Sequence, residues 1–285
     1  MTEALVAALA AIDRDEPAIL VEIVEALGST PREAGAVLLV TGDASVGTIG
    51  GGELEHRAIL RARDALAGEP LPERLDLPLG PALAQCCGGH VTLRLRHLAA
   101  ADRAMLAERL TARQAGLPRV VLFGAGHVGR AVVAALAPLP CRVLWLDSRP
   151  GQLPAEAPGQ VETMEIADPA GFTTSPGDLV LVMTHSHPLD LAIVEAMLRR
   201  GDFAWLGLIG SATKRQRFER QLAAVGLSAE RLVCPIGLAA ITGKEPAVIA
   251  ASVAAQLLVA MEALGQGRLG PGPAEQERRL MYVVR

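Results

Sequence analysis

The chain has 285 residues, of which 51% are hydrophobic and 20% are charged, so it is long enough for about two domains with buried cores. Its formal net charge is −4, and aromatic residues make up only 2% of the chain. Nucleic-acid-binding proteins are normally basic and often stack aromatic side chains on bases. The composition therefore argues against a nucleic-acid partner.

Four cysteines in a chain of this length do not make a disulfide framework, which favours a reducing compartment. The first residues carry no basic stretch of the kind that opens a secretory signal, and Glu3 interrupts the apolar run early. The longest apolar stretch, residues 248–264, contains Ser252, Gln256 and Glu262, which favours a buried core helix over a membrane span. We therefore expect a cytoplasmic protein with no membrane partner.

The first part of the chain mixes strand and helix patterns. We expect strands over residues 18–24, 35–40 and 91–95, and helices over residues 53–66 and 99–116. The pattern changes after residues 116–118, and we place a domain boundary there. Residues 1–116 are then an N-terminal α/β domain, and residues 117–285 form a second domain.

The second part alternates short apolar runs with helical stretches. The runs predict strands over residues 119–123, 142–146, 178–183 and 204–209, and the stretches between them predict helices over residues 127–136, 189–200 and 212–225. Continuous apolar strands that alternate with helices are typical of a parallel sheet covered on both faces. The sequence therefore predicts a doubly wound, Rossmann-like domain.

A glycine fingerprint, Gly124, Gly126 and Gly129 in GAGHVG, follows the first strand of this domain and opens its first helix. Asp147 ends the next strand, where an acid meets a ribose hydroxyl in dinucleotide sites. The loop suits NAD(P) or another phosphorylated cofactor; alternatively, the glycines serve only tight strand–helix packing. His127, inside the fingerprint, faces either a ligand or solvent.

Two further loops follow strands of the same domain. His185 and His187, in THSHPLD, could line the ligand pocket or ligate a metal; alternatively, one His caps a helix in a polar turn. Ser211 could cap the next helix, whose first N–H groups could bind an anion. Three basic residues follow it and either add positive charge there or form a solvated face: Lys214, Arg215 and Arg217.

Two glycine-rich loops occur in the first domain, at residues 28–32 and 47–53. The second loop leads into a helix and is a potential phosphate nest, with a flexible turn as the alternative.

The pentapeptide Gln85, Cys86, Cys87, Gly88 and Gly89 stands apart from the rest of the chain. Adjacent cysteines cannot join distant segments, and a disulfide between them would be strained. Soft thiolates beside bare backbone suit a soft metal or sulfur chemistry. The alternative is a pair of small buried hydrophobic residues before a turn.

Taken together and in order, these segments resemble the xanthine dehydrogenase accessory protein family of the XdhC/CoxI type. The matching segments are GSTPREAGAVLLV, GTIGGGELE, LGPALAQCCGGHVTL, VVLFGAGHVGRAV, VMTHSHPLDLAIVEAML, LGLIGSATKRQRF and PIGL. QCCGG and THSHPLD are far more specific than the glycine fingerprint.

The resemblance implies a chaperone that binds the molybdenum cofactor, guards it from oxidation, assists its sulfuration and delivers it to xanthine dehydrogenase or a related molybdenum hydroxylase. It implies the apoenzyme, a cysteine desulfurase and a second copy of the chain as partners. The cofactor would contact Gln85, Gly88 and Cys86 or Cys87, with Cys86 as the candidate molybdenum contact, and its phosphate would bind at the glycine fingerprint.

The chain departs from the family pattern at two places. Many members have a Cys after the triple glycine, where this chain has Glu53, so a thiol role does not transfer to that position. Many also have an acid after PIGL, where Ala239 and Ala240 stand here, so a function of that acid does not transfer either.

Three hypotheses follow. The first is a non-enzymatic carrier of the molybdenum cofactor. The second is an NAD(P)-dependent oxidoreductase with His127 or His185 as the acid–base group, although hydride transfer does not need QCCGG. The third is a metal-storage or insertion protein that uses Cys86, Cys87, His185 and His187.

Overall fold

The computed structural model describes residues 2–79 and 88–267, and the fold below is that of these residues. The chain divides into two compact units, residues 1–116 and 117–285. Each unit has its own sheet and its own buried core, so each is described by itself.

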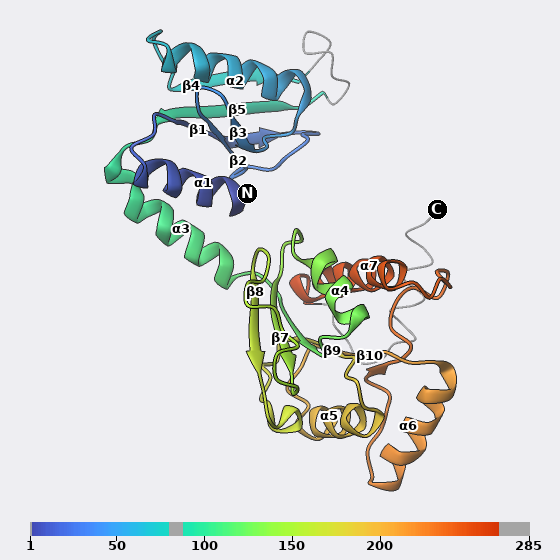
Figure 1. Ribbon diagram of the computed structural model, residues 1–285. Helices are drawn as coiled ribbons and strands as arrows, with labels where there is room; N and C mark the ends of the chain where they lie inside the picture. Colours follow the sequence, from blue (N-terminus) through green and yellow to red (C-terminus); the bar gives the residue numbers. More distant parts are fainter. Residues whose placement is uncertain (1, 80–87, 268–285) are drawn as a thin grey trace. The chain divides into compact units, whose positions relative to one another are not determined.

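The first unit is built on an antiparallel sheet with the strand order β3-β2-β1-β5-β4. Its strands are β1 (Ile19–Leu27), β2 (Val37–Val40), β3 (Ser45–Gly47), β4 (Arg74–Pro78) and β5 (His90–His97). Helix α2 (Gly52–Leu66) covers one face, and α1 (Thr2–Asp13) and α3 (Arg103–Ala115) cover the other (Figure 1).

Alternation along β1 explains why helices cover both faces of this sheet. Ile19, Val21 and Ile23 pack under α2, whereas Leu20 packs with Leu5 of α1. Side chains of successive strand residues point to opposite faces, so an apolar run such as ILVEI supplies two cores at once.

The predicted strands and helices of the first unit are all present, within a few residues of their expected ends. The predicted helix over residues 99–116 is a short 3₁₀ turn, η2 (Ala100–Asp102), followed by α3. α1, β3 and β4 were not predicted from the sequence. β3 has only three residues, and β4 is an edge strand in which Arg74, Asp76 and Pro78 are exposed, so neither carries a strong apolar pattern.

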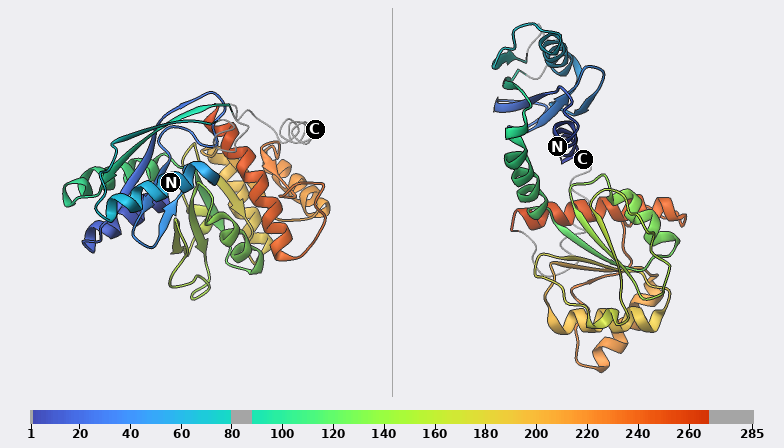
Figure 2. Two further views of the ribbon diagram at one scale, coloured as in Figure 1. Left: turned by 90° about the horizontal axis from the view of Figure 1, so that it is seen from above. Right: turned by 60° about the vertical axis from the view of Figure 1, so that its left-hand side comes forward.

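The second unit is a parallel sheet with the order β11-β10-β9-β6-β7-β8. Its strands are β6 (Arg119–Phe123), β7 (Arg142–Asp147), β8 (Val161–Glu165), β9 (Leu179–Val182), β10 (Trp205–Leu208) and β11 (Leu232–Val233). Helices α4 (His127–Leu136) and α7 (Pro246–Gly265) cover one face, and α5 (His187–Arg200) and α6 (Ala212–Ala224) cover the other (Figures 1 and 2). The predicted Rossmann-like domain is confirmed.

The strand order places the reversal of the sheet between β6 and β9. The chain runs outward from β6 through β7 to β8, returns to β9 on the other side of β6, and continues to β10 and β11. Connections on the two sides of this point diverge, which leaves a crevice beyond the carboxyl ends of the two strands. Loops that follow β6, β7 and β9 meet there.

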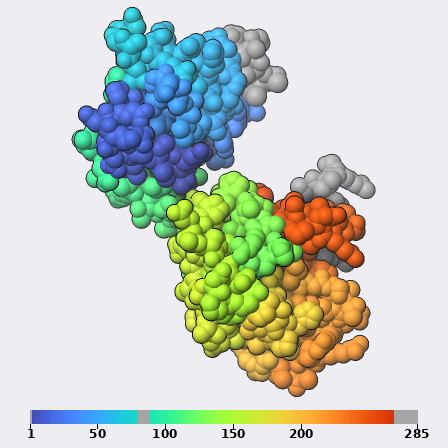
Figure 3. All heavy atoms as spheres, in the orientation of Figure 1, coloured from blue at the N-terminus to red at the C-terminus, as the bar shows by residue number. Residues whose placement is uncertain are grey.

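Helix α7 is the one described helix that is long and apolar enough to cross a membrane by length and composition. In the structure it packs along α4, with Val253, Leu257 and Met261 in the core of the second unit. Part of α7 remains on the surface of the unit beside α4 (Figure 3). These contacts agree with the predicted core helix.

Candidate functional site

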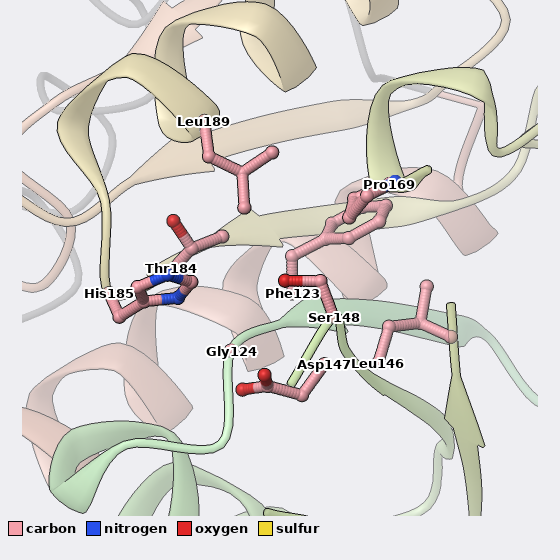
Figure 4. A pocket seen from close by; sticks show the side chains of 9 residues that line it. All are labelled: Phe123, Gly124, Leu146, Asp147, Ser148, Pro169, Thr184, His185 and Leu189. Atoms are coloured by element: carbon pink, nitrogen blue, oxygen red, sulfur yellow. The ribbon is translucent and has the colours of Figure 1, made fainter. Parts of the chain in front are cut away.

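The crevice between β6 and β9 contains a small pocket at the carboxyl edge of the sheet. Asp147 at the end of β7 and Ser148 just after it line the pocket, and the loop after β9 supplies Thr184 and His185 (Figure 4). Apolar side chains complete the wall: Phe123, Leu146, Pro169 of the 3₁₀ turn η3 (Pro169–Gly171), and Leu189. The pocket volume is about 10 Å³, room for about one water molecule.

The three glycines of the fingerprint have different roles in this loop. A Cβ on Gly124, whose φ is +119°, would overlap the carbonyl oxygen of Met183 at the end of β9. A Cβ on Gly129 would overlap the carbonyl oxygen of Gly124, so α4 packs directly on the loop. Gly126 differs, because a Cβ there would meet no atom within 4 Å. Gly124 and Gly129 therefore serve packing, and Gly126 leaves open space for a ligand.

Side chains of β7 fix the glycine loop in place. The indole Nε1–H of Trp145 donates to the carbonyl oxygen of Gly124 at 3.0 Å. The N–H of Ala125 donates to Oδ2 of Asp147 at 2.6 Å. Both residues of β7 are buried, so the loop is held from the sheet side and its other side is left for a ligand.

Asp147 is also held by Arg149. The Nε and Nη2 atoms of Arg149 donate to the two carboxylate oxygens at 3.0 and 2.9 Å, and its backbone N–H donates to Oδ1 at 2.9 Å. Burial alone would raise the pKa of Asp147, but these bonds and the bond from Ala125 outweigh burial and lower the pKa to about 2. The carboxylate predicted to accept a ribose hydroxyl therefore already has a protein donor on each oxygen.

The first N–H groups of α4 are the free donors of the site. Within the described residues, no acceptor is bonded to the N–H of Gly126, His127 or Val128. These groups lie at the positive end of the helix dipole, where an anion is stabilised. Gly126 and His127 are exposed, so an anionic group can reach these donors from solvent.

A buried ion pair holds the loop after β9. Oδ1 of Asp190 accepts hydrogen bonds from the N–H and the hydroxyl of Thr184, at 2.9 and 2.7 Å. Oδ2 of Asp190 lies 2.7 Å from Nζ of Lys214, and these side chains are 1% and 10% exposed. Lys214 also donates to the carbonyl oxygen of Ile209 at 2.8 Å. The pair thus ties the ends of β9 and β10 to α5 and α6.

The two histidines of THSHPLD lie in different positions. His185 lines the pocket, whereas His187 is exposed in the first turn of α5 and does not line it. The expectation that one His caps the helix is wrong, because the hydroxyl of Ser186 accepts the capping bond from Leu189. Pro188 occupies the first turn of α5. Among residues 2–79 and 88–267, no three His, Cys, Asp or Glu side chains are grouped as a metal ion would require.

Ser211 caps α6 as predicted, since its hydroxyl accepts a hydrogen bond from the N–H of Lys214 at 3.2 Å. The expected basic patch beside it is largely absent. Lys214 is bound to Asp190, and Arg215 binds Glu219 and the carbonyl oxygens of Ala229 and Leu232. Of the three basic residues named above, Arg217 is the exposed one.

The second glycine-rich loop of the first unit already holds an anion from its own chain. Oε2 of Glu55 accepts hydrogen bonds from the hydroxyl of Thr48 at 2.6 Å and from the N–H groups of Ile49 and Gly51 at 3.0 and 3.1 Å. The predicted phosphate nest at residues 47–53 is therefore filled by a carboxylate, and the loop is clamped rather than flexible.

The two glycine-rich loops and the end of QCCGG approach one another in the first unit. A Cβ on Gly50 would overlap Pro31, and a Cβ on Gly89 would overlap the carbonyl oxygen of Ser29. Gln85, Cys86 and Cys87 lie outside the described residues, whereas Gly88 and Gly89 lie inside them.

The two cysteines of the second unit are buried. Burial raises the pKa of Cys141 and of Cys234 to about 11, so both remain neutral thiols at neutral pH. Neither is a candidate for thiolate chemistry in the folded protein.

Three residues that shape this site were not predicted from the sequence: Trp145, Arg149 and Asp190. Lys214 was predicted only as a basic residue beside Ser211, and its pairing with Asp190 was not. Asp190 and Lys214 each fall in the first turn of a helix that follows neighbouring strands, and they carry opposite charges. That pairing is a signal the sequence does contain. Arg149 lies two residues after a strand-end acid, a spacing that permits the bidentate contact observed.

Comparisons with known proteins agree with this architecture. Residues 120–257 match the XdhC Rossmann domain, and residues 11–76 match the XdhC and CoxI family. The uncharacterized protein YqeB of Escherichia coli strain K12 is 30% identical over 254 residues, which are 85% of this chain and 43% of that protein. The chain thus spans less than half the length of that relative.

Among solved structures, the chain is similar to a protein of Bacillus halodurans described as a xanthine dehydrogenase. The TM-score is 0.74 and the identity is 20%, and the superposition covers 93% of this chain and 96% of the other. At this identity the likeness shows a shared fold.

Proposed function

The chain belongs to the XdhC and CoxI family, and from this premise we propose that it is a chaperone that binds the molybdenum cofactor, protects it, assists its sulfuration and delivers it to a molybdenum hydroxylase. Membership of the family indicates a xanthine dehydrogenase accessory role. Accessory proteins of this family are generally non-catalytic, and the proposal assigns no turnover chemistry to this chain.

The free N–H groups around Gly126 carry the proposal. The molybdenum cofactor has a phosphate, a pterin and a metal held by a dithiolene, and the phosphate is the part that a helix N-terminus recognises. The donors of Gly126, His127 and Val128 have no acceptor among the described residues, and a Cβ at Gly126 would meet nothing. The residues present therefore fit a phosphate.

The charges around the loop also suit an anion. Asp147 lies directly beneath the loop, where an unpaired carboxylate would repel a phosphate. Its bidentate pair with Arg149 balances that charge, and the side chain of Asp147 is only 2% exposed. The charge of Asp147 is thus buried and balanced by Arg149. On the solvent-facing side of the loop, the positive end of the α4 dipole is the main electrostatic contribution.

We assign the thiol contact to QCCGG, with Cys86 as the candidate ligand of molybdenum and Cys87 as the alternative. A thiolate is a soft ligand that suits the cofactor's metal and its terminal sulfur. Neither Cys141 nor Cys234 can supply this thiolate, because both thiols are buried and remain neutral. The proposal extends to partners: a molybdenum hydroxylase apoenzyme, a cysteine desulfurase and a second copy of the chain, in the cytoplasm.

The NAD(P)-dependent oxidoreductase is the second candidate, since the Rossmann unit and the glycine loop would serve a dinucleotide as well. Asp147 favours the carrier over this candidate. A dinucleotide's adenosine ribose needs a free acceptor at the end of β7, and both oxygens of Asp147 are bonded to Arg149 and Ala125. The neighbouring pocket of about 10 Å³ is also too small for a purine base.

The test is anaerobic retention of freshly released molybdenum cofactor on gel filtration, detected as the fluorescent oxidised pterin, with NAD and NADP run in parallel. We expect stoichiometric retention by the native chain and loss of retention in Gly126→Val, because the added side chain covers the free donors. Gly177→Val is the matched control, since Gly177 is also exposed and open but lies in the turn at the amino end of β9.

Cys86→Ala tests the thiol contact in the same assay, and we expect weakened retention with unchanged thermal stability. If Cys86→Ala retains the cofactor as well as the native chain does, the thiol contact of Cys86 would be contradicted, but the phosphate site would not. If the native chain retains NAD and does not retain the cofactor, the result would contradict the carrier proposal and favour the oxidoreductase.

A further inference from the structure

A second, larger pocket lies at the same carboxyl edge of the second unit, beyond β10 and β11. Its volume is about 150 Å³, well above the roughly 10–15 Å³ that one water molecule needs. Four isoleucines and two glycines supply most of its wall: Ile209, Ile236, Ile241, Ile249, Gly210 and Gly243. Apolar walls around a few polar groups are typical of sites for small organic ligands.

Ser252 supplies the polar group of this pocket. It lies on α7, lines the pocket and is 4% exposed. Its Oγ accepts the N–H of Leu238 at 2.7 Å, but no described residue accepts its hydroxyl hydrogen. A buried donor without an acceptor is unfavourable, because it has lost its hydrogen bond to water. An acceptor atom on a bound ligand would satisfy it.

The wall of the pocket is held rigidly around Ser252. Gln256, one turn further along α7, donates to the carbonyl oxygen of Gly237 at 3.2 Å and accepts its N–H at 2.8 Å. A Cβ on Gly237 would meet Oγ of Ser252, so the loop after β11 lies directly against the helix. The pocket is therefore formed before any ligand arrives.

The position of this pocket relates it to the glycine loop. β6 and β10 are separated by one strand, β9, so their carboxyl ends are about 10 Å apart at ordinary strand spacing. A ligand whose phosphate binds at the start of α4 can thus place a ring a short linker away. The pocket beside Asp147 holds only about one water molecule, whereas the pocket beyond β10 has room for a ring.

We propose that the pocket formed by Ile209, Ile236, Ile241, Ile249 and Ser252 binds the pterin ring of the ligand whose phosphate binds at Gly126. The isoleucines contact the faces of the fused ring, and the hydroxyl of Ser252 donates to one of its heteroatom acceptors. This assignment rests on the proposed function, because a pterin follows from the molybdenum cofactor.

The test uses 6-hydroxymethylpterin, which has the ring but no phosphate, and follows its fluorescence during titration with the full chain. Ile241→Trp fills the pocket from an exposed position, since Ile241 is 42% exposed. Val225→Trp is the matched control, because Val225 is 44% exposed at the end of α6 and does not line the pocket. We expect Ile241→Trp to weaken pterin binding at least tenfold, and Val225→Trp to leave it unchanged.

Four results are informative. Equal pterin binding by the native chain and Ile241→Trp would place the ring elsewhere and overturn the proposal, as would the absence of saturable binding up to about 1 mM. Ile241-dependent pterin binding by a chain that fails to retain the cofactor would uphold the pocket and reject the proposed function. Loss of both pterin and cofactor binding in Ile241→Trp, with the control unchanged, supports both.

Discussion

The carboxylate of Asp147 lies 2.6 Å from the backbone nitrogen of Ala125, so the acid that ends β7 is bonded to the glycine loop itself. Through this bond and its pair with Arg149, Asp147 fixes the loop that presents the free donors of Gly126 and His127. The same contact explains why the acid is not free for a ribose.

The folded protein lowers the pKa of Asp147 to about 2, and this predicts a pH dependence of stability. A lowered carboxyl pKa contributes stability that is fully present above the unfolded value of about 4 and is lost as pH falls through the folded value. We expect Asp147→Asn to be about 2 kcal/mol less stable than the native chain at neutral pH.

Urea unfolding followed by tryptophan fluorescence measures this gap, because both tryptophans, Trp145 and Trp205, lie in the second unit. The gap should narrow as pH falls from about 4 to about 2. A gap that stays constant over this range would mean that the ionised carboxylate does not stabilise the unit.

The structure predicts that the same substitution, glycine to alanine, has different effects on stability at two positions of the glycine loop. Gly129→Ala should destabilise the second unit by about 1–3 kcal/mol, because the new Cβ overlaps the carbonyl oxygen of Gly124. Gly126→Ala should change stability by less than about 0.5 kcal/mol, since its Cβ enters open space. Urea unfolding of both variants measures this difference, and equal losses would refute the division of roles between the glycines.

The pair between Asp190 and Lys214 predicts strong coupling. Lys214→Met leaves a carboxylate that is 1% exposed without its cation, and Asp190→Asn leaves the buried ammonium without its anion. Each change should cost about 3–5 kcal/mol of unfolding free energy, and the double variant should cost less than the sum. Additive losses in this double-mutant cycle would show that the two groups do not interact.

We predict that removing the carboxylate of Glu55 opens an anion-binding site at the N–H groups of Ile49 and Gly51. Glu55→Ala removes the acceptor of the N–H groups of Ile49 and Gly51, which should speed their hydrogen exchange. Added sulfate should then raise the melting temperature of the variant more than that of the native chain. Glu53→Ala is the control, because Glu53 lies in the same turn but bonds to Arg57 on the surface. If sulfate raises the melting temperatures of the native chain, Glu55→Ala and Glu53→Ala equally, the anion site at this loop would be contradicted.

Much of the second unit could be predicted from the sequence because its strands are buried on both faces. RVVLF and RVLWL read as continuous apolar runs, and the glycine loop between strand and helix has a fixed spacing. β8 was missed because VETME is a charged, exposed edge strand, and β11 has only two residues, too few for a clear pattern. Edge position and short length remove the apolar signal on which prediction depends.

The polar contacts of the site could not be read in the same way. The sequence shows that Asp147 ends a strand. Whether its carboxylate oxygens face solvent or an arginine depends on the conformation of the Arg149 side chain, which the sequence does not show. Likewise, Lys214 looks like part of a solvated basic face, and only packing of α6 against α5 brings it to Asp190. Burial and partners arise from tertiary structure, so they appear only in the fold.

The central claim is that the phosphate of the molybdenum cofactor binds the free N–H groups at the start of α4. Backbone amide NMR of the full chain during anaerobic addition of the cofactor tests it most directly. The account predicts large shifts for the amides of Gly126, His127 and Val128, and a smaller shift for Ala125, whose N–H already bonds to Asp147. Shifts confined to the first unit, with the amides of the glycine loop unchanged, would contradict it.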